Sequence, residues 1–395
     1  MTQKNLPLAG LRVAEFCHVV MGPTCGLVLA DLGAEVIKIE PPEGDHTRKL
    51  VASGAGFFPT YNRNKKSFAV DLRAPEGREA VLKLVASADV LTENFRTGAM
   101  DKLGFGYEAL KKIRPELIYC SMKGFLAGPY QHRTGLDEVV QMMGGLAYMT
   151  GGRHGPLRAG ASVNDVMGGM FGAIAILAAL HQRTETGRGQ YVQSALFENN
   201  AFLVAQHMME GLASGKPVPP MPDRIRAWAI YDNFRTRNGE LLFVGVVTDT
   251  QWKIFCDSFG LATLLADPAL ATNPQRVEAR PRILPIVTEI FAKMTKQELM
   301  DRCEALGLPF APIAKPDDLF DDPHLNASGG LTPLTLPDGR KTKVPNLPIE
   351  MDGVRFGTRL DLPRVGEHTR ELLADLGYRP DEVAGLISRR IVHAA

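Results

Sequence analysis

The first third of the chain alternates short apolar segments with amphipathic ones, and this alternation limits the possible folds more than any other feature. Leu11–Phe16 and Ala34–Glu40 have the composition of strands, and a helix is predicted between them from Pro23 to Gly33. Two strands joined by a short helix form a βαβ unit with parallel strands and a right-handed crossover. The pattern repeats at 67–72, 75–88, 89–95, 107–113 and 116–125. We therefore predict an α/β fold whose large domain is a Rossmann-like parallel sheet, with ligands bound at the carboxyl ends of its strands.

The chain has 395 residues, more than one ordinary hydrophobic core holds, which predicts about two or three domains. Residues 1–213 are assigned to the first part of the large domain. The Pro- and Gly-rich segment 214–224 has the composition of a linker. A hairpin signal at Asn238 and Gly239, followed by helical patterns, predicts a small α+β domain over 225–330. Residues 331–395 favour strands, turns and a final helix.

The composition excludes several classes of protein. The net charge is +1 with charges mixed along the sequence, which argues against binding to nucleic acid or to a membrane surface. Five scattered cysteines without a CxxC pair argue against a disulfide framework and against a zinc site, so no metal is expected. The start of the chain lacks a signal-peptide pattern, and the apolar run Val166–Leu180 is shorter than the roughly 20 residues that span a bilayer. We expect a soluble cytoplasmic protein.

Asp165 is the last charged residue before this apolar run, within the segment AGASVNDVMGGM. One interpretation is structural, because Asp is a favoured helix N-cap whose oxygens accept hydrogen bonds from the first backbone N–H groups. The other is chemical: the same donors would keep a reactive carboxylate ionised, and Gly168 and Gly169 would let a substrate approach the backbone closely. The local pattern leaves both interpretations open.

Eight segments, taken in order over nearly the whole chain, closely resemble the class III CoA-transferases, a family shared with the α-methylacyl-CoA racemases. Many matches in the same order are together strong evidence for this resemblance. Several of them, taken singly, show only residues that are common in sheets and turns. The segments are LAGLRVAEF, MGPTCGLVLADLGAEVIKIEPPEGD, NKKSFAVDL, ADVLTENFRTGAMDKLGFGYEALKKIRPELIYCSMKGF, GLDEVVQMMGG, NDVMGGM, ALHQRTETGRGQYV and VGEHTRELLADLGY.

The resemblance implies that Asp165 is a nucleophile. In such transferases the carboxylate attacks the thioester carbonyl to give a mixed anhydride, the CoA thiolate returns to form an enzyme thioester, and the acceptor acid reverses the sequence. Coenzyme A is then a substrate, and no permanently bound cofactor or metal is expected. The nucleophile must be ionised, which Asp is at pH 7 unless burial raises its pKa strongly. Backbone N–H groups near Gly168 and Gly169 are a hypothetical site for the developing oxyanion.

The resemblance also implies which residues of this chain contact CoA. The diphosphate and 3′-phosphate of CoA require cations and backbone donors. Arg73, Arg96 and Lys102 would each, taken alone, be typical of a solvated surface. Their common position just beyond predicted strand ends favours a ligand site. Asp137 corresponds to a second acidic residue near the reaction centre, or it caps the helix that follows it. The transferred positions are Val20, Met21, Leu72, Arg73, Asn94, Phe95, Arg96, Lys102 and Asp137.

Two departures limit this transfer. Formyl-CoA transferases have Gln where this chain has Val20 and a glycine-rich shielding loop where it has DRIRAWAIYDNF, which argues against formyl or oxalate specificity. The racemases place His immediately before the residue equivalent to Asp137, and here that residue is Leu136. Arg224 and Arg226 stand where the shielding loop would be, and a bidentate Arg is suited to a second substrate carboxylate. We therefore hypothesise a dicarboxylic substrate that resembles succinate, malate or itaconate.

The histidines nearest these motifs are His18, His132 and His154, and none has metal-ligand spacing. All three are expected in the core or at the rim of the site, with His18 as a candidate substrate contact. The loop after the first strand, Cys17–Pro23, lacks GxGxxG, which disfavours a nicotinamide-dependent oxidoreductase.

The sequence therefore predicts a class III CoA-transferase that acts on small acyl-CoA thioesters and carboxylic acids. From the resemblance we expect an interlocked-ring homodimer in which 331–395 returns to the large domain. The alternatives are a racemase that uses Asp165 as an acid or base and a CoA-binding protein without catalysis.

Overall fold

The computed structural model describes residues 6–152, 155–224 and 226–395, which form two compact units. The first unit combines Met1–Pro222 with Pro323–Ala395, and the second is Asp223–Asp322. The second unit ends eight residues before the limit of 330 expected from the sequence. Helix α15 (Pro323–Ala327) belongs to the first unit, where Lys343 donates a hydrogen bond to Asn326 and the backbone N–H of Asn346 bonds to Gly330.

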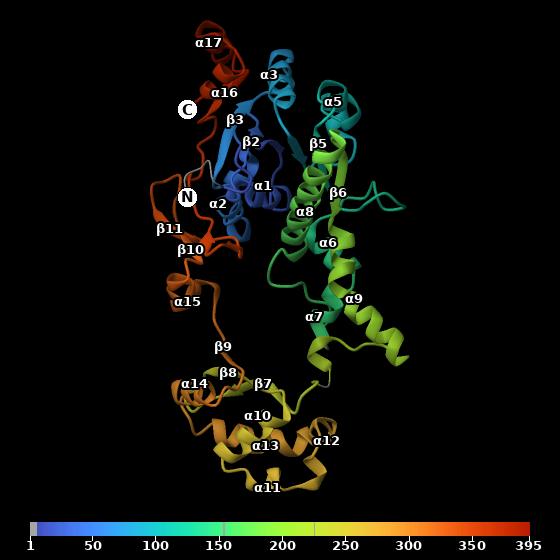
Figure 1. Ribbon diagram of the computed structural model, residues 1–395, viewed down its shortest axis with the longest axis vertical. Coiled ribbons are helices and arrows are strands. Elements are labelled where there is room, and N and C mark those ends of the chain that lie inside the picture. Colours follow the sequence, from blue (N-terminus) through green and yellow to red (C-terminus); the bar gives the residue numbers. More distant parts are fainter. Residues whose placement is uncertain (1–5, 153–154, 225) are drawn as a thin grey trace. The chain divides into compact units, whose positions relative to one another are not determined.

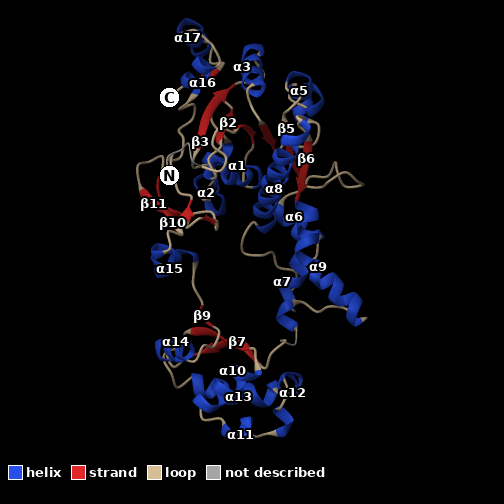
Figure 2. Cartoon of the chain, in the orientation of Figure 1, coloured by secondary structure: helices blue, strands red, loops and turns tan. Residues whose placement is uncertain are grey.

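A seven-stranded sheet forms the centre of the first unit, with the order β14-β3-β2-β1-β4-β5-β6 (Figures 1 and 2). All neighbouring pairs are parallel except β14 with β3. The chain builds outward from β1 to β3, returns to β4 on the other side of β1, and continues to β6, which confirms the predicted α/β class. The strands are β1 (Arg12–Phe16), β2 (Glu35–Glu40), β3 (Lys65–Val70), β4 (Val90–Glu93), β5 (Ile118–Lys123), β6 (Tyr191–Ala195) and β14 (Val392–His393).

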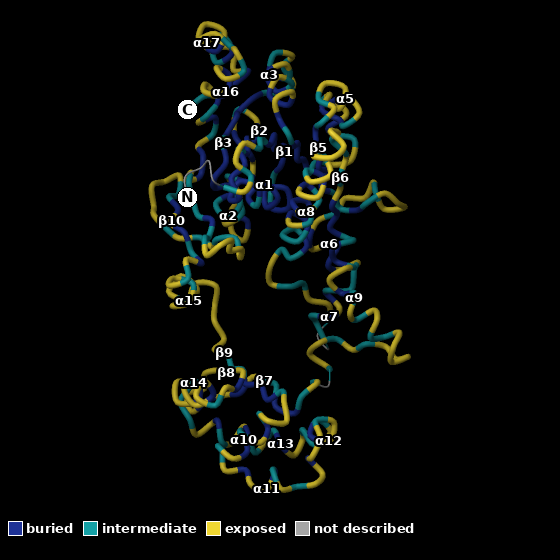
Figure 3. The backbone as a smooth tube through the Cα atoms, viewed as in Figure 1, coloured by how far each residue is buried: buried dark blue, intermediate teal, exposed yellow. Residues whose placement is uncertain are grey.

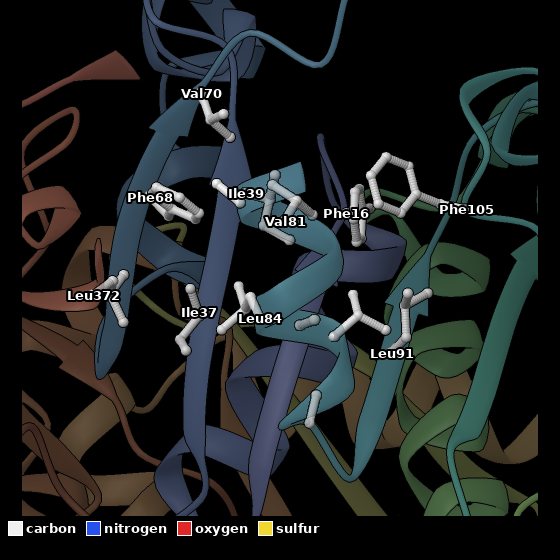
Figure 4. Packing of buried hydrophobic residues seen from close by; sticks show 14 of the residues in the cluster. Phe16, Ile37, Ile39, Phe68, Val70, Val81, Leu84, Leu91, Phe105 and Leu372 are labelled. Carbon is white, nitrogen blue, oxygen red and sulfur yellow. The ribbon is translucent and has the colours of Figure 1, made fainter. Parts of the chain in front are cut away.

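Both faces of this sheet are buried, because successive side chains of a strand point to opposite faces and each face is covered by helices. In β2, Ile37 faces a core built with α3 (Pro75–Ala86), α5 (Tyr107–Ile113), α16 (Thr369–Asp375) and α17 (Pro380–Ser388). Figure 4 shows Val81 and Leu84 of α3 among the strand residues of this core. The adjacent Val36 belongs to the opposite core, which is built with α1 (Met21–Asp31) and α8 (Val163–Thr186).

Helix α8 begins two residues before the predicted cap, with Ser162 as its N-cap. It packs against α1, β5, β6 and α9 (Leu196–Ser214). By length and composition alone it could cross a membrane, and 39% of its apolar window is buried within the structure. Figure 3 shows much of α9 as exposed. The large apolar side chains exposed on the two helices are Met170, Ile174, Leu177, Phe202, Leu203, Met208, Met209 and Leu212.

Smaller elements complete the first unit and position its loops. Phe58 of α2 (Phe57–Tyr61) packs with Leu334 and Leu362 from the C-terminal segment. The remaining elements are α4 (Ala99–Leu103), α6 (Asp137–Met143), α7 (Leu146–Gly151), β10 (Leu331–Thr335), β11 (Lys341–Pro345), β12 (Glu350–Met351) and β13 (Val354–Arg355).

The second unit is a small α+β fold around a three-stranded antiparallel sheet in the order β7-β8-β9. Gly239 has φ +80° in the predicted hairpin turn, a conformation that favours glycine. Phe234, Phe255 and Phe291 pack together in the core of this unit. Its main elements are β7 (Ile230–Arg235), β8 (Leu241–Val246), β9 (Phe310–Pro312), α10 (Asp249–Ser258), α11 (Ala262–Leu265), α12 (Asn273–Glu278), α13 (Arg280–Phe291) and α14 (Lys296–Ala305).

Candidate active site

A cavity of about 1220 Å³ lies in the first unit, lined largely by the loops that follow β1, β2, β4 and β5 and by the starts of α6 and α8. The strand order reverses between β1 and β4, and in open α/β sheets ligands bind in the crevice at such a reversal. Its volume exceeds that of a typical drug-sized site. Residues central to the site are His18, Val20, Met21, Asn94, Phe95, Arg96, Asp137, Arg158 and Asp165.

Asp165 lines this cavity as the third residue of α8, so the predicted N-cap role is wrong. Its own backbone N–H donates to Asp137 Oδ1 at 3.2 Å. Burial, followed by the nearby negative charge of Asp137, raises the pKa of Asp165 to about 7, and Arg158 opposes this shift. The helix donors therefore do not keep this carboxylate ionised, and at neutral pH it is divided between its two protonation states.

Asp137 caps the helix that carries Asp165 rather than its own helix. Its Oδ1 accepts hydrogen bonds from the backbone N–H groups of Asn164 and Asp165 at 2.8 and 3.2 Å. Its Oδ2 accepts from Gln141 Nε2 at 2.6 Å, and Gln141 Oε1 in turn accepts from the N–H of Ala159. The predicted cap for α6 is therefore wrong, because Asp137 is the first helical residue and Leu136 precedes it as the N-cap. Two carboxylates thus share one helix terminus.

Gly168 and Gly169 allow helix packing and do not hold an oxyanion. Both lie inside α8, where backbone N–H groups are used by the helix itself. A Cβ on Gly168 would lie 2.5 Å from Met21 Cε, and one on Gly169 would lie 2.5 Å from Met21 O and 2.6 Å from Thr24 Cβ. The glycines therefore bring α1 close to α8, and the oxyanion hypothesis for them is wrong.

The loop between β1 and α1 is fixed by side chains from other elements. Asn94 Oδ1 accepts from the N–H of His18 and Asn94 Nδ2 donates to the carbonyl of His18. The N–H of Val19 donates to Thr47 Oγ1 at 3.0 Å, and Val19 has φ +66°, which is rare for a β-branched residue. Val20 and Met21 follow, both buried at the cavity wall. Burial lowers the pKa of His18, so its ring is largely neutral at pH 7.

The other transferred CoA positions divide into two groups. Phe95 and Arg96 line the cavity, and the Phe95 ring centroid is 5.3 Å from that of His18. Leu72, Arg73 and Lys102 are not among the described residues that line it. Leu72 packs against the core, and Arg73 is an exposed side chain paired with Asp71 at 2.9 Å. The contact of those three residues with CoA stays a prediction.

Arg224 and Arg226 belong to the second unit, and their proposed role stays a prediction. Of the three histidines, His18 and His132 line the cavity, whereas His154 lies outside the described residues.

Sequence reasoning missed Arg158, which lines the cavity with Asp165. Its Nε and Nη2 donate to the carbonyls of Ala159 and Ala161 at 3.2 and 3.3 Å. Its ion pairs with Asp137 and Glu138 are long, at 3.5 and 3.6 Å. The available signal was its position seven residues before Asp165 in a segment of small side chains.

Sequence reasoning also missed a buried ionic network beneath the loop after β1. Lys65 pairs with Glu15 at 2.8 Å, and Lys38 pairs with Asp45 at 2.7 Å and donates to the carbonyl of Cys17 at 2.6 Å. Charged residues inside otherwise apolar strands, as in EVIKIE, were the available signal.

This chain resembles known proteins over most of its length. Residues 8–369 match the family model described as CoA-transferase family III. The chain is 35% identical over 389 residues to the succinate–glutarate CoA-transferase of Agrobacterium fabrum, covering 95% of this chain and 97% of that protein. It is 33% identical over 386 residues to the succinyl-CoA:mesaconate CoA-transferase of Haloarcula hispanica, covering 94% and 96%. A solved CAIB/BAIF family protein from Brucella suis has a TM-score of 0.83 and 36% identity, covering 94% of this chain and 100% of that one.

The matches span nearly all of the chain and include the segment that carries Asp165. They set aside the alternative of a CoA-binding protein without catalysis. This chain belongs to CoA-transferase family III and is an enzyme of that family.

Proposed function

We propose that this enzyme moves CoA from succinyl-CoA, or a related dicarboxylyl-CoA, to a carboxylic acid, with Asp165 as the nucleophile. The observation that carries the proposal is an incompletely neutralised carboxylate in the large cavity. Within residues 6–152, 155–224 and 226–395, no side chain forms an ion pair or hydrogen bond with the Asp165 carboxylate, and its pKa is raised to about 7. The names of the two relatives, which act on succinate, glutarate or mesaconate, support the dicarboxylic substrate class.

The proposed reaction is a series of acyl exchanges. An Asp165 carboxylate oxygen attacks the thioester carbonyl, the C–S bond breaks, and CoA leaves as a thiolate with formation of a mixed anhydride. The thiolate then attacks the Asp165 carbonyl and releases the donor acid, which leaves an Asp165–CoA thioester. The acceptor carboxylate attacks that thioester, the C–S bond breaks, and the thiolate leaves with formation of a second anhydride. The thiolate then attacks the acceptor carbonyl of this anhydride and displaces the Asp165 carboxylate. Asp165 is regenerated, and no proton is gained or lost overall.

Burial suits Asp165 to this chemistry. A carboxylate with little solvation has fewer hydrogen bonds to lose on attack, and the raised pKa measures how poorly its charge is solvated. Because a thioester and an acid are exchanged for another thioester and acid, the overall reaction is close to thermoneutral.

Intact-protein mass spectrometry with succinyl-CoA tests the nucleophile. Borohydride reduction or hydroxylamine trapping should give an adduct that maps to Asp165, and the adduct should be absent in Asp165→Ala. Asp301→Ala, which removes an exposed carboxylate of the second unit, is the matched control and should label like the parent protein. An adduct that persists in Asp165→Ala would reject the assignment.

A racemase that uses Asp165 as an acid or base is the second candidate, since a pKa of about 7 also suits proton transfer at neutral pH. The exposed Leu136, where racemases have His, opposes it. Exchange of the α-proton of a 2-methylacyl-CoA into deuterated solvent, without any covalent adduct, would favour the racemase.

We also propose a cytoplasmic, interlocked homodimer. The exposed apolar side chains of α8 and α9 support a subunit interface, because large exposed apolar patches commonly mark protein contacts. Light scattering after size exclusion would give the mass of a dimer, and a monomeric mass would oppose it. The mixed charges along the sequence and the scattered cysteines support a cytoplasmic location.

A further inference from the structure

The proposed dicarboxylic substrates carry a second carboxylate that does not react. The proposed reaction does not say which side chain binds it. When the proximal carboxylate reacts at Asp165, the distal one enters a cavity that already contains the carboxylates of Asp165, Asp137 and Glu138. Transfer of a carboxylate out of water next to like charges is costly unless a cation offsets it.

Arg158 has donors available for this purpose. Its guanidinium carries five N–H donors, and two of its nitrogens bond to backbone carbonyls at 3.2 and 3.3 Å. Its carboxylate neighbours are beyond hydrogen-bond distance, and the closer oxygen of Asp137 accepts from Gln141 at 2.6 Å. Arg158 therefore keeps N–H donors that no described side chain accepts in a hydrogen bond, and it lines the cavity.

Lys123 also lines the cavity, but its donors are already occupied. It bonds to both oxygens of Glu93 at 2.6 and 2.8 Å and to the carbonyl of Phe95 at 2.6 Å. Three further cations line the cavity from other segments: Lys49 after β2, Arg96 after β4, and Arg133 after β5, where it lies 4.1 Å from the centroid of the Tyr130 ring. Arg158 belongs to the segment that leads directly into α8. Arg158 is thus the cation tied to the same terminus as the proposed nucleophile.

The segment around Arg158 holds its position and leaves space. The N–H of Ala159 donates to Gln141, which binds Asp137, so this segment is connected to the carboxylate that caps α8. The next residues are Gly160 and Ala161, and a Cβ on Gly160 would meet no atom within 4 Å. Gly160 and Ala161 therefore add no bulk next to Arg158, which itself lines the cavity.

We propose that Arg158 binds the distal carboxylate of the dicarboxylic acyl group, through paired N–H donors, while the proximal carbonyl reacts at Asp165. The inference rests on the proposed function and assigns its substrate selectivity to one side chain. A planar guanidinium matches a carboxylate in a bidentate manner, which a lysine ammonium does not reproduce.

Two four-carbon donors test the assignment, because succinyl-CoA has the distal carboxylate and butyryl-CoA has a methyl group in its place. Formation of the Asp165–CoA thioester is measured in single turnovers. At pH 8.5, where an Asp165 carboxylate with a pKa of about 7 is mostly ionised, Arg158→Gln should lower the second-order rate constant for succinyl-CoA by roughly 10- to 100-fold and change the value for butyryl-CoA by less than about threefold. Arg158→Lys should recover part of the loss. Arg188→Gln, an exposed arginine after α8, is the charge-matched control and should change neither.

A second readout does not depend on turnover. In an Asp165→Ala background, Arg158→Gln should weaken binding of succinyl-CoA, measured by calorimetry, and leave binding of butyryl-CoA nearly unchanged. Equal losses for both donors, with a pH profile displaced to higher pH, would overturn the assignment and show that Arg158 acts through Asp165. No loss for either donor would also overturn it. If the parent enzyme forms no thioester with either donor, the proposed function fails, and the role of Arg158 fails with it.

Discussion

Two groups of buried carboxylates lie in the first unit, and they differ in how their charge is neutralised. Below the loop after β1, Glu15 and Asp45 are paired with Lys65 and Lys38 at 2.8 and 2.7 Å. Although burial favours the protonated form, Lys38 and Thr47 lower the pKa of Asp45 to about 2. At the start of α8, Asp137 receives backbone donors, whereas the pKa of Asp165 is raised to about 7.

This difference in neutralisation distinguishes carboxylates with a structural role from a carboxylate that can react. A buried carboxylate with a close cation is locked in its ionised form and positions the loop around it. A buried carboxylate beside another carboxylate has its pKa raised toward physiological pH, as is typical of functional groups. Both groups of carboxylates are buried, so burial alone does not distinguish the structural group from the reactive one. The position of the neighbouring lysines distinguishes them.

Lys65→Met gives the largest expected effect on stability, because it removes the close cation of the buried Glu15 at 2.8 Å and leaves only Lys38, at 3.9 Å. We expect the free energy of unfolding to fall by about 3–5 kcal/mol, measured by urea denaturation followed by circular dichroism. The double variant Glu15→Gln/Lys65→Met should recover a substantial part of this loss. A single variant as stable as the parent would show that the pair is not structural.

Asp165→Asn should raise the free energy of unfolding, whereas Lys65→Met should lower it. Because the pKa of Asp165 is about 7 in the folded protein and 3.8 for an unperturbed Asp side chain, its protonated form stabilises the fold below pH 3.8, and that stabilisation is lost as pH rises through 7. The variant should therefore match the parent near pH 4 and exceed it by roughly 1–4 kcal/mol at pH 8. Thermal melts at both pH values measure this, and a variant less stable at pH 8 would contradict it.

The smallest expected effect is on the pH dependence of catalysis. Since only ionised Asp165 attacks, kcat/KM should fall about tenfold per pH unit below an apparent pKa near 7 and level off above it. Asp137→Asn removes the neighbouring negative charge, so the apparent pKa should move to lower pH. Initial rates with succinyl-CoA between pH 5.5 and 8.5 measure both. A profile that is flat across this range in the parent enzyme would refute the raised pKa.

The sequence predicted the features that depend on neighbouring residues. Strands at Leu11–Phe16 and Ala34–Glu40, the parallel α/β sheet and the hairpin at Gly239 all follow from apolar periodicity and turn chemistry, and the structure confirms them. Asp165 was singled out because it precedes an apolar run, and it does line the cavity.

The tertiary structure decided the features that depend on distant partners. Asp137 is separated from Asp165 by 28 residues, and Lys65 from Glu15 by 50, so no local pattern shows which helix Asp137 caps or which strand charges are neutralised. Gly168 and Gly169 looked like donors near a helix start, and only the approach of α1 reveals their packing role. Local periodicity determines which elements form, whereas the pKa of a carboxylate depends on solvation and on charges that only the folded sheet brings together.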